Sequence, residues 1–157
     1  EAGSKVLLMT PPPFYKPYLL AKHPIAVYGD DGPDGRLAKT LSMMRNFSGA
    51  MNIPLLDLHR IFSAIGEIGE EPASLIRNKA NSNSEDGVHP TPEGYRVIAS
   101  CLYEMIVCLK LPSSRILCFG DSITYGLNAA GMGSSEDGES YPARLNALIN
   151  GKASSKT

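Results

Sequence analysis

The chain has 157 residues, of which 15 are basic and 16 acidic, and its formal net charge is −1. This length is typical of one domain with a sizeable core, and the balanced charge argues against nucleic acid or an anionic membrane as a partner. The longest apolar stretch, Val97–Leu111, is interrupted by polar residues and is shorter than the roughly 20 residues of a membrane-spanning helix. We therefore expect no insertion into a membrane.

The first third of the chain alternates between patterns typical of strands and of helices. Val6–Met9 is a continuous apolar run ended by three prolines, which predicts a strand buried on both faces. Phe14–Gly35 is rich in proline and glycine and predicts a long loop. Apolar residues at spacings of three and four predict an amphipathic helix over Arg36–Asn52, and Pro54–Leu58 predicts a second strand.

The clearest helix signal comes in the middle of the chain. Pro72–Arg77 predicts one short helical turn, and the polar stretch Asn78–Asp86 predicts a loop. Thr91 is a favoured N-cap residue and Pro92 suits the first helical position, so a helix is expected to start there. An apolar stripe then continues to Leu109 at helical spacing.

The last third adds one strand and one helix. Arg115–Phe119 is apolar after its first residue and predicts a third strand, and Tyr141–Asn150 predicts a helix that Gly151 can close. Strands alternating with helices indicate an α/β protein with a parallel sheet and helices on both faces. Ligands of such sheets bind at the carboxyl ends of the strands.

Three side chains that suit nucleophilic catalysis lie next to the third predicted strand and the Thr91 helix. Ser122 comes directly after the third predicted strand, and Asp86 and His89 share one short loop before the Thr91 helix. A serine hydroxyl becomes a useful nucleophile when a base accepts its proton, and that base needs an acceptor on its other nitrogen. These residues predict Ser122 as nucleophile, His89 as general base and Asp86 as the orienting acid. Taken singly, each motif is equally consistent with a structural role, an Asp-Gly turn at Asp86 or a helix cap at Ser122.

Together the two motifs resemble a known family. Gly120–Gly126, which reads Gly-Asp-Ser-Ile-Thr-Tyr-Gly, and Asp86–Thr91, which reads Asp-Gly-Val-His-Pro-Thr, are similar to the SGNH, or GDSL, family of serine esterases and lipases. Met9–Phe14 and Pro54–Leu58 also resemble segments of its arylesterase branch. The resemblance implies a flavodoxin-like three-layer α/β/α sandwich with a parallel sheet.

The resemblance also implies roles for individual residues. Ser122 would form the acyl-enzyme, His89 would act as base, Asp86 would orient it, and the backbone N–H of Ser122 would be one donor of the oxyanion hole. Neither a metal nor an organic cofactor is implied. The expected substrate is a small-molecule ester of a small or medium acyl group.

The order of the motifs departs from that of the family. Residues 1–110 resemble the family's C-terminal part and residues 111–157 its N-terminal part, and the middle blocks with a catalytic glycine and Gly-x-Asn-Asp are not found. We therefore expect one domain over residues 1–157 that is incomplete or circularly permuted. A complementary polypeptide segment or a second copy of the chain is the protein partner that this pattern suggests.

The chain is thus predicted to be a serine esterase. A non-catalytic binding domain on the same scaffold is the main alternative, and a flavodoxin-like mononucleotide binder is a weaker one. No signal peptide is visible, and the three cysteines lie in apolar runs typical of reduced thiols, which favours a cytoplasmic location. The patterns leave open the acyl length, the leaving group and the oligomeric state.

Overall fold

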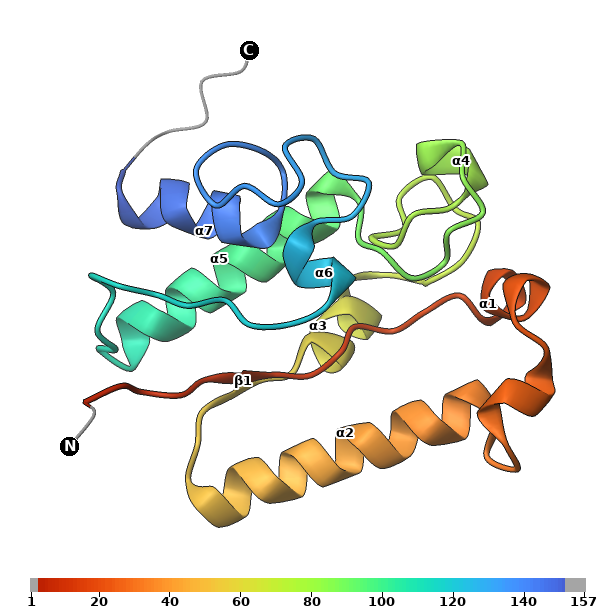
Figure 1. The fold of residues 1–157 in the computed structure, drawn as a ribbon, viewed down its shortest axis with the longest axis horizontal. Helices are drawn as coiled ribbons and strands as arrows, with labels where there is room; N and C mark the ends of the chain where they lie inside the picture. Colours follow the sequence, from red (N-terminus) through yellow and green to blue (C-terminus); the bar gives the residue numbers. More distant parts are fainter. Residues whose placement is uncertain (1–2, 152–157) are drawn as a thin grey trace. The chain divides into compact units, whose positions relative to one another are not determined.

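The computed structural model describes residues 3–151 (Figure 1). The chain divides into two compact units, of which the first ends at Val88 and the second begins at His89. The single domain expected over residues 1–157 remains a prediction. Within the described range, no helix combines the length and the hydropathy needed to cross a membrane.

The first unit contains a short parallel sheet. Strand β1 (Leu8–Met9) pairs with β2 (Leu55–Leu56), so that Leu8 lies opposite Leu55 and Met9 opposite Leu56. The Leu8 N–H donates to the carbonyl of Pro54 at 2.9 Å, and the Thr10 N–H donates to that of Leu56 at 3.0 Å. The two strands predicted in this half of the chain are confirmed, although each is shorter than its apolar run. The expected burial of the first strand on both faces is wrong, because Leu8 and Met9 are both half-buried.

Helices make up most of the remaining regular structure in this unit. Their bounds are α1 Lys16–Lys22, the 3₁₀ helix η1 Ile25–Tyr28, α2 Gly32–Met51, α3 Leu58–Ile65 and α4 Lys79–Ser82. The amphipathic helix predicted from residue 36 is confirmed as α2, which already starts at Gly32. The loop predicted over residues 14–35 is wrong, because α1, η1 and the start of α2 lie within it. Prolines stand in the first turns of α1 and α2, where the missing N–H is not needed.

Two further local predictions are corrected by side-chain caps. The second strand stops before Leu58, because the Asp57 carboxylate accepts a hydrogen bond from the Arg60 N–H and starts α3. The helical turn predicted over residues 72–77 does not form, and α4 begins in the expected loop instead. There Asn78 and Asn81 form a capping box, in which each side chain accepts from the other's backbone N–H.

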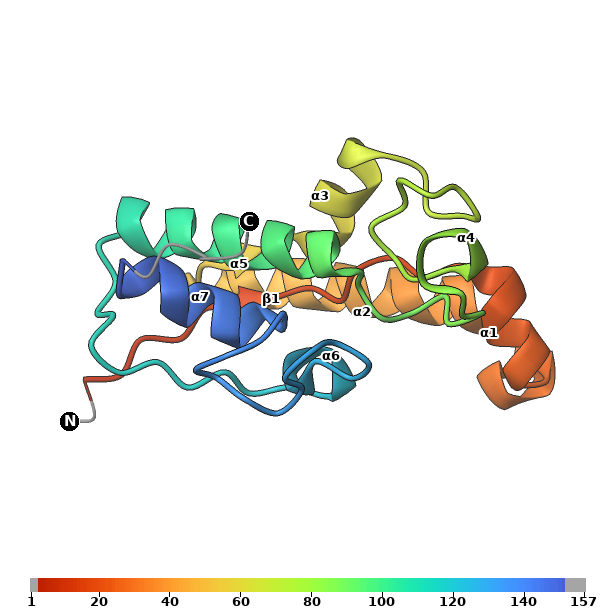
Figure 2. The same ribbon diagram turned by 90° about the horizontal axis from the view of Figure 1, so that it is seen from above.

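The second unit is built on two packed helices. Helix α5 (Pro92–Cys108) packs against α7 (Tyr141–Ile149), and both views show them side by side (Figures 1 and 2). The predicted start of α5 is confirmed, because the Thr91 hydroxyl accepts a hydrogen bond from the Gly94 N–H at 3.1 Å. The buried apolar side chains of the two helices are Tyr95, Ile98, Ala99, Leu102, Ile106, Tyr141, Ala143 and Leu145.

The strand predicted at Arg115–Phe119 does not form. Residues 116–120 have no regular secondary structure, and no backbone–backbone hydrogen bond within residues 3–151 involves residues 112–120. A strand exists through hydrogen bonds to a neighbouring strand, so an apolar run alone does not produce one. The described part of the chain is therefore mixed: mainly helical, with a small parallel sheet, as in an incomplete α/β fold.

Candidate active site

The turn that carries Ser122 is held by Asp121. Helix α6 (Ser122–Tyr125) begins with Ser122, and Asp121 is its N-cap residue. The Asp121 carboxylate accepts a hydrogen bond from the Ile123 N–H at 2.9 Å. The alternative in which Ser122 itself caps a helix is therefore wrong. Because the carboxylate of Asp121 provides the cap, the Ser122 hydroxyl is available for other contacts.

Glycines on both sides of Ser122 are required by close approach. A Cβ at Gly120 would clash with the Thr124 hydroxyl oxygen. Gly126 ends α6 with a φ of 75°, and a Cβ there would lie 2.5 Å from the Cβ of Ser140. The left-handed conformation of Gly126 and its close approach to Ser140 leave no room for a side chain there, and a side chain at Gly120 would require Thr124 to move. This turn therefore has a backbone path that few other sequences allow.

A buried hydrogen bond connects α6 to α7. The Thr124 hydroxyl and the Tyr141 hydroxyl lie 2.9 Å apart, and Tyr141 is 1% exposed. Burial raises the pKa of Tyr141 to about 12, with the Thr124 hydrogen bond acting in the opposite direction. Neither residue is predicted from the sequence, because no local pattern shows that these two hydroxyls meet. Their contact fixes α6, and with it Ser122, on α7.

The structure brings His89 and Ser122 together within the second unit. The distance from His89 Nε2 to Ser122 Oγ is 2.9 Å, and both side chains are half-buried. His89 lies two residues before the Thr91 cap of α5, which determines where its loop ends. With its proton on Nδ1, the imidazole can accept the serine proton at Nε2. The arrangement therefore suits activation of a serine hydroxyl.

The backbone N–H of Ser122 is also available. It belongs to the first turn of α6, where N–H groups have no partner within the helix. Within residues 3–151, no hydrogen bond is found for it. Such an N–H is able to donate to a negatively charged oxygen that forms beside the serine.

Asp86 lies at the end of the first unit and is 6% exposed. Its carboxylate accepts a hydrogen bond from the Val88 N–H at 2.9 Å, and its carbonyl accepts one from Lys22 Nζ at 3.1 Å. The next residue, Gly87, has a φ of 76° and donates its N–H to the Arg77 carbonyl. Asp86 therefore helps to shape the loop that leads to His89, and its role as orienting acid stays a prediction.

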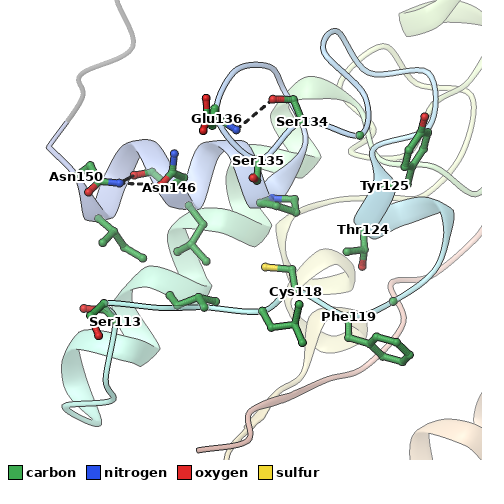
Figure 3. A pocket seen from close by; sticks show the side chains of 18 of the residues that line it. Ser113, Cys118, Phe119, Thr124, Tyr125, Ser134, Ser135, Glu136, Asn146 and Asn150 are labelled. Atoms are coloured by element: carbon green, nitrogen blue, oxygen red, sulfur yellow. Dashed lines mark hydrogen bonds between the residues drawn. The ribbon is translucent and has the colours of Figure 1, made fainter. Parts of the chain in front are cut away.

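A pocket of about 850 Å³ lies beside the serine turn in the second unit (Figure 3). Gly120, Asp121 and Thr124 form one part of its wall, and α7 contributes Leu145 and Ile149. Its volume lies within the range of small-molecule sites, roughly 300–1,000 Å³. The described residues contain no group of three or more histidine, cysteine or acidic side chains arranged to hold a metal ion. All three cysteines are free thiols.

Comparison with known families identifies the class of this protein. The family described as GDSL-like lipase/acylhydrolase matches residues 2–102, which is more than half of the chain. The chain belongs to this family, whose members have the SGNH-hydrolase fold and hydrolyse esters. The matched region includes Asp86 and His89 and ends before Ser122. Neither the curated proteins nor the solved structures gave a significant match.

Proposed function

We propose that the protein is a serine esterase that forms an acyl-enzyme on Ser122. The observation that supports this most directly is the 2.9 Å distance between His89 Nε2 and Ser122 Oγ. It lies within the 2.6–3.2 Å range expected for a nucleophile and its general base. Membership of a lipase and acylhydrolase family supports an ester as the substrate.

In the proposed reaction, Ser122 Oγ attacks the ester carbonyl while His89 Nε2 accepts the hydroxyl proton. The tetrahedral intermediate then collapses, the bond to the alcohol oxygen breaks, and His89 returns the proton to the leaving alcohol. Water repeats the attack on the acyl-enzyme, with His89 again as base, and releases the carboxylic acid. The substrates are esters of small or medium acyl groups.

Two further groups complete the proposal. The Ser122 N–H would donate to the oxyanion, since it has no partner in the described structure. Asp86 would accept from His89 Nδ1 and hold the ring in the required tautomer, as its place three residues before the histidine suggests. A circular order of the family's sequence blocks remains part of this proposal.

The second candidate is a non-catalytic binding domain on the same scaffold. It is favoured by one observation, that the family match ends at residue 102 and so does not include Ser122. A scaffold that kept the fold without the chemistry would still bind an ester or acid, and would neither react at Ser122 nor turn the ester over.

A fluorophosphonate probe and an aryl ester of a short acyl group distinguish the two. The probe is expected to modify Ser122, and Ser122→Ala should abolish both labelling and turnover. Ser100→Ala, a change of an exposed serine on α5 that does not line the pocket, should alter neither. His89→Ala should lower turnover by about 10²–10⁴. The losses should not add in the double variant, because both residues serve one proton transfer. Unchanged turnover in Ser122→Ala would refute the assignment, and an unlabelled but ester-binding wild type would support the binding domain.

A further inference from the structure

The segment Arg115–Asp121 lacks a strand partner: its two end residues are bends, and residues 116–120 between them have no regular secondary structure. Figure 3 shows it as an extended stretch along one wall of the pocket, and the backbone of residues 112–120 forms no backbone–backbone hydrogen bond with any described residue. Its side chains from Ile116 to Phe119 carry no charge. An uncharged extended segment with free N–H and C=O groups is a template for pairing with another strand.

The exposure of its side chains alternates in the way that a strand requires. Leu117 is 86% exposed and Phe119 is 92% exposed, whereas Ile116 is 38% exposed and Cys118 is half-buried. Successive side chains of a strand point to opposite faces, so Ile116 and Cys118 share one face and Leu117 and Phe119 share the other. The exposure of residues 116–119 therefore fits a strand with one apolar face uncovered.

We propose that Arg115–Asp121 pairs with the same segment of a second copy of this chain, antiparallel and about a two-fold axis at Cys118. In this register Arg115 of each copy lies opposite Asp121 of the other, and Leu117 lies opposite Phe119. Arg115 and Asp121 are both exposed, and neither forms an ion pair with another described residue. The segment is thus complementary to itself in charge and in apolar character, as a two-fold interface requires.

Other antiparallel registers lose one of these features. A shift that centres the pair on Leu117 places Arg115 opposite Phe119 and leaves Asp121 without a partner. A shift by a single position exchanges the two faces and sets exposed Leu117 opposite half-buried Cys118. The register centred on Cys118 is therefore the one that pairs opposite charges and keeps the apolar face continuous.

Sedimentation of the full chain over a range of concentrations tests the pairing. A reversible dimer is expected, and Leu117→Lys or Phe119→Lys should raise its dissociation constant about tenfold or more, because each change removes two symmetry-related cross-strand pairs. Val107→Lys is the matched control, since Val107 is 52% exposed on α5 outside the segment. Circular dichroism shows whether each variant is folded. A chain that stays monomeric, or a control that weakens the dimer equally, would overturn the proposal.

Disulfide trapping tests the register. In a Cys101→Ser/Cys108→Ser background, two Cys118 thiols would lose two electrons and two protons to added diamide and form one disulfide between copies. Opposite residues of an antiparallel pair have Cα atoms about 4.5–5.5 Å apart, within the range of a disulfide. Burial raises the pKa of Cys118, so the oxidation is best run at alkaline pH. In the same background, Cys118→Ser/Ile116→Cys should cross-link far less, and equal yields would refute this register.

Discussion

Replacing Tyr141 by phenylalanine tests how the serine turn is fixed. The change removes one hydroxyl that lies 2.9 Å from the Thr124 hydroxyl, and the ring it belongs to is 1% exposed. A net hydrogen bond contributes about 0.5–1.5 kcal/mol, and a partner left unsatisfied costs about 1–3 kcal/mol. We therefore expect Tyr141→Phe to lower the free energy of unfolding by about 1–2 kcal/mol near neutral pH.

The same substitution has a distinct signature at high pH. The pKa of Tyr141 is about 12 in the folded protein, compared with about 10 for an unperturbed tyrosine. Because the folded value is raised, the associated stability is fully present below about pH 10 and is lost as the pH rises toward the folded value. By pH 12 this loss amounts to about 2 kcal/mol in the wild type and is absent from the phenylalanine variant.

Urea unfolding followed by circular dichroism measures both effects. The stability advantage of wild type over Tyr141→Phe should fall from about 1–2 kcal/mol near neutral pH to about zero near pH 12, or reverse there by up to about 1 kcal/mol in favour of the variant. Tyr125→Phe is the control, because Tyr125 is 53% exposed and its removal should change stability by less than about 0.5 kcal/mol. A difference that stays constant with pH would show that the Tyr141 hydroxyl titrates as freely as an exposed one, and would refute the reasoning.

Two further predictions concern the first unit. The Asp57 carboxylate caps α3, and a hydrogen bond from Arg45 lowers its pKa. The stability that this ionised carboxylate contributes is therefore present above about pH 3.9 and is lost as the pH falls through the pKa of Asp57 in the folded protein. Asp57→Ala should lower the free energy of unfolding by about 0.5–2 kcal/mol at neutral pH, as measured by thermal or urea unfolding. If wild type and variant differ by the same amount in strong acid, the proposed role of the ionised carboxylate is contradicted. Gly87→Ala should cost about 2 kcal/mol or more, because φ is 76° and the new Cβ would lie 2.9 Å from that of Tyr18. Gly49→Ala, in open space on α2, should instead stabilise by about 0.5–1 kcal/mol, and equal effects at the two glycines would refute the role of the left-handed turn.

Elements with local signals were predictable from the sequence. The start of α5 follows from Thr91 and Pro92, and the span of α7 follows from its apolar spacing and the Gly151 that comes after it. The strand predicted at Arg115–Phe119 does not form, and this could not be foreseen from its apolar run, because pairing depends on groups far away in the chain. Asp57 lies in a predicted strand and Asn78 in a predicted loop, although in the structure each residue caps a helix. Asparagine and aspartate suit both turns and caps, so their identity alone does not decide between them.

For the candidate site, residue types and spacing were enough to select His89 and Ser122, which the structure places 2.9 Å apart. Asp121 holds the turn that carries Ser122 through its cap on the Ile123 N–H. The Thr124–Tyr141 contact was not predictable, because it depends on how α6 meets α7 in three dimensions. Sequence motifs therefore indicated the candidate groups, and the structure added what supports them.

The contact between His89 and Ser122 closes a loop of 33 residues that includes all of α5. Closing a loop of this length has an entropic cost, and the packing of α5 against α7 helps to offset it. The pair should therefore form late when the second unit folds and break early when it unfolds. Chemical reactivity at Ser122 would then report on the integrity of the whole unit, well beyond the few atoms that meet at the serine.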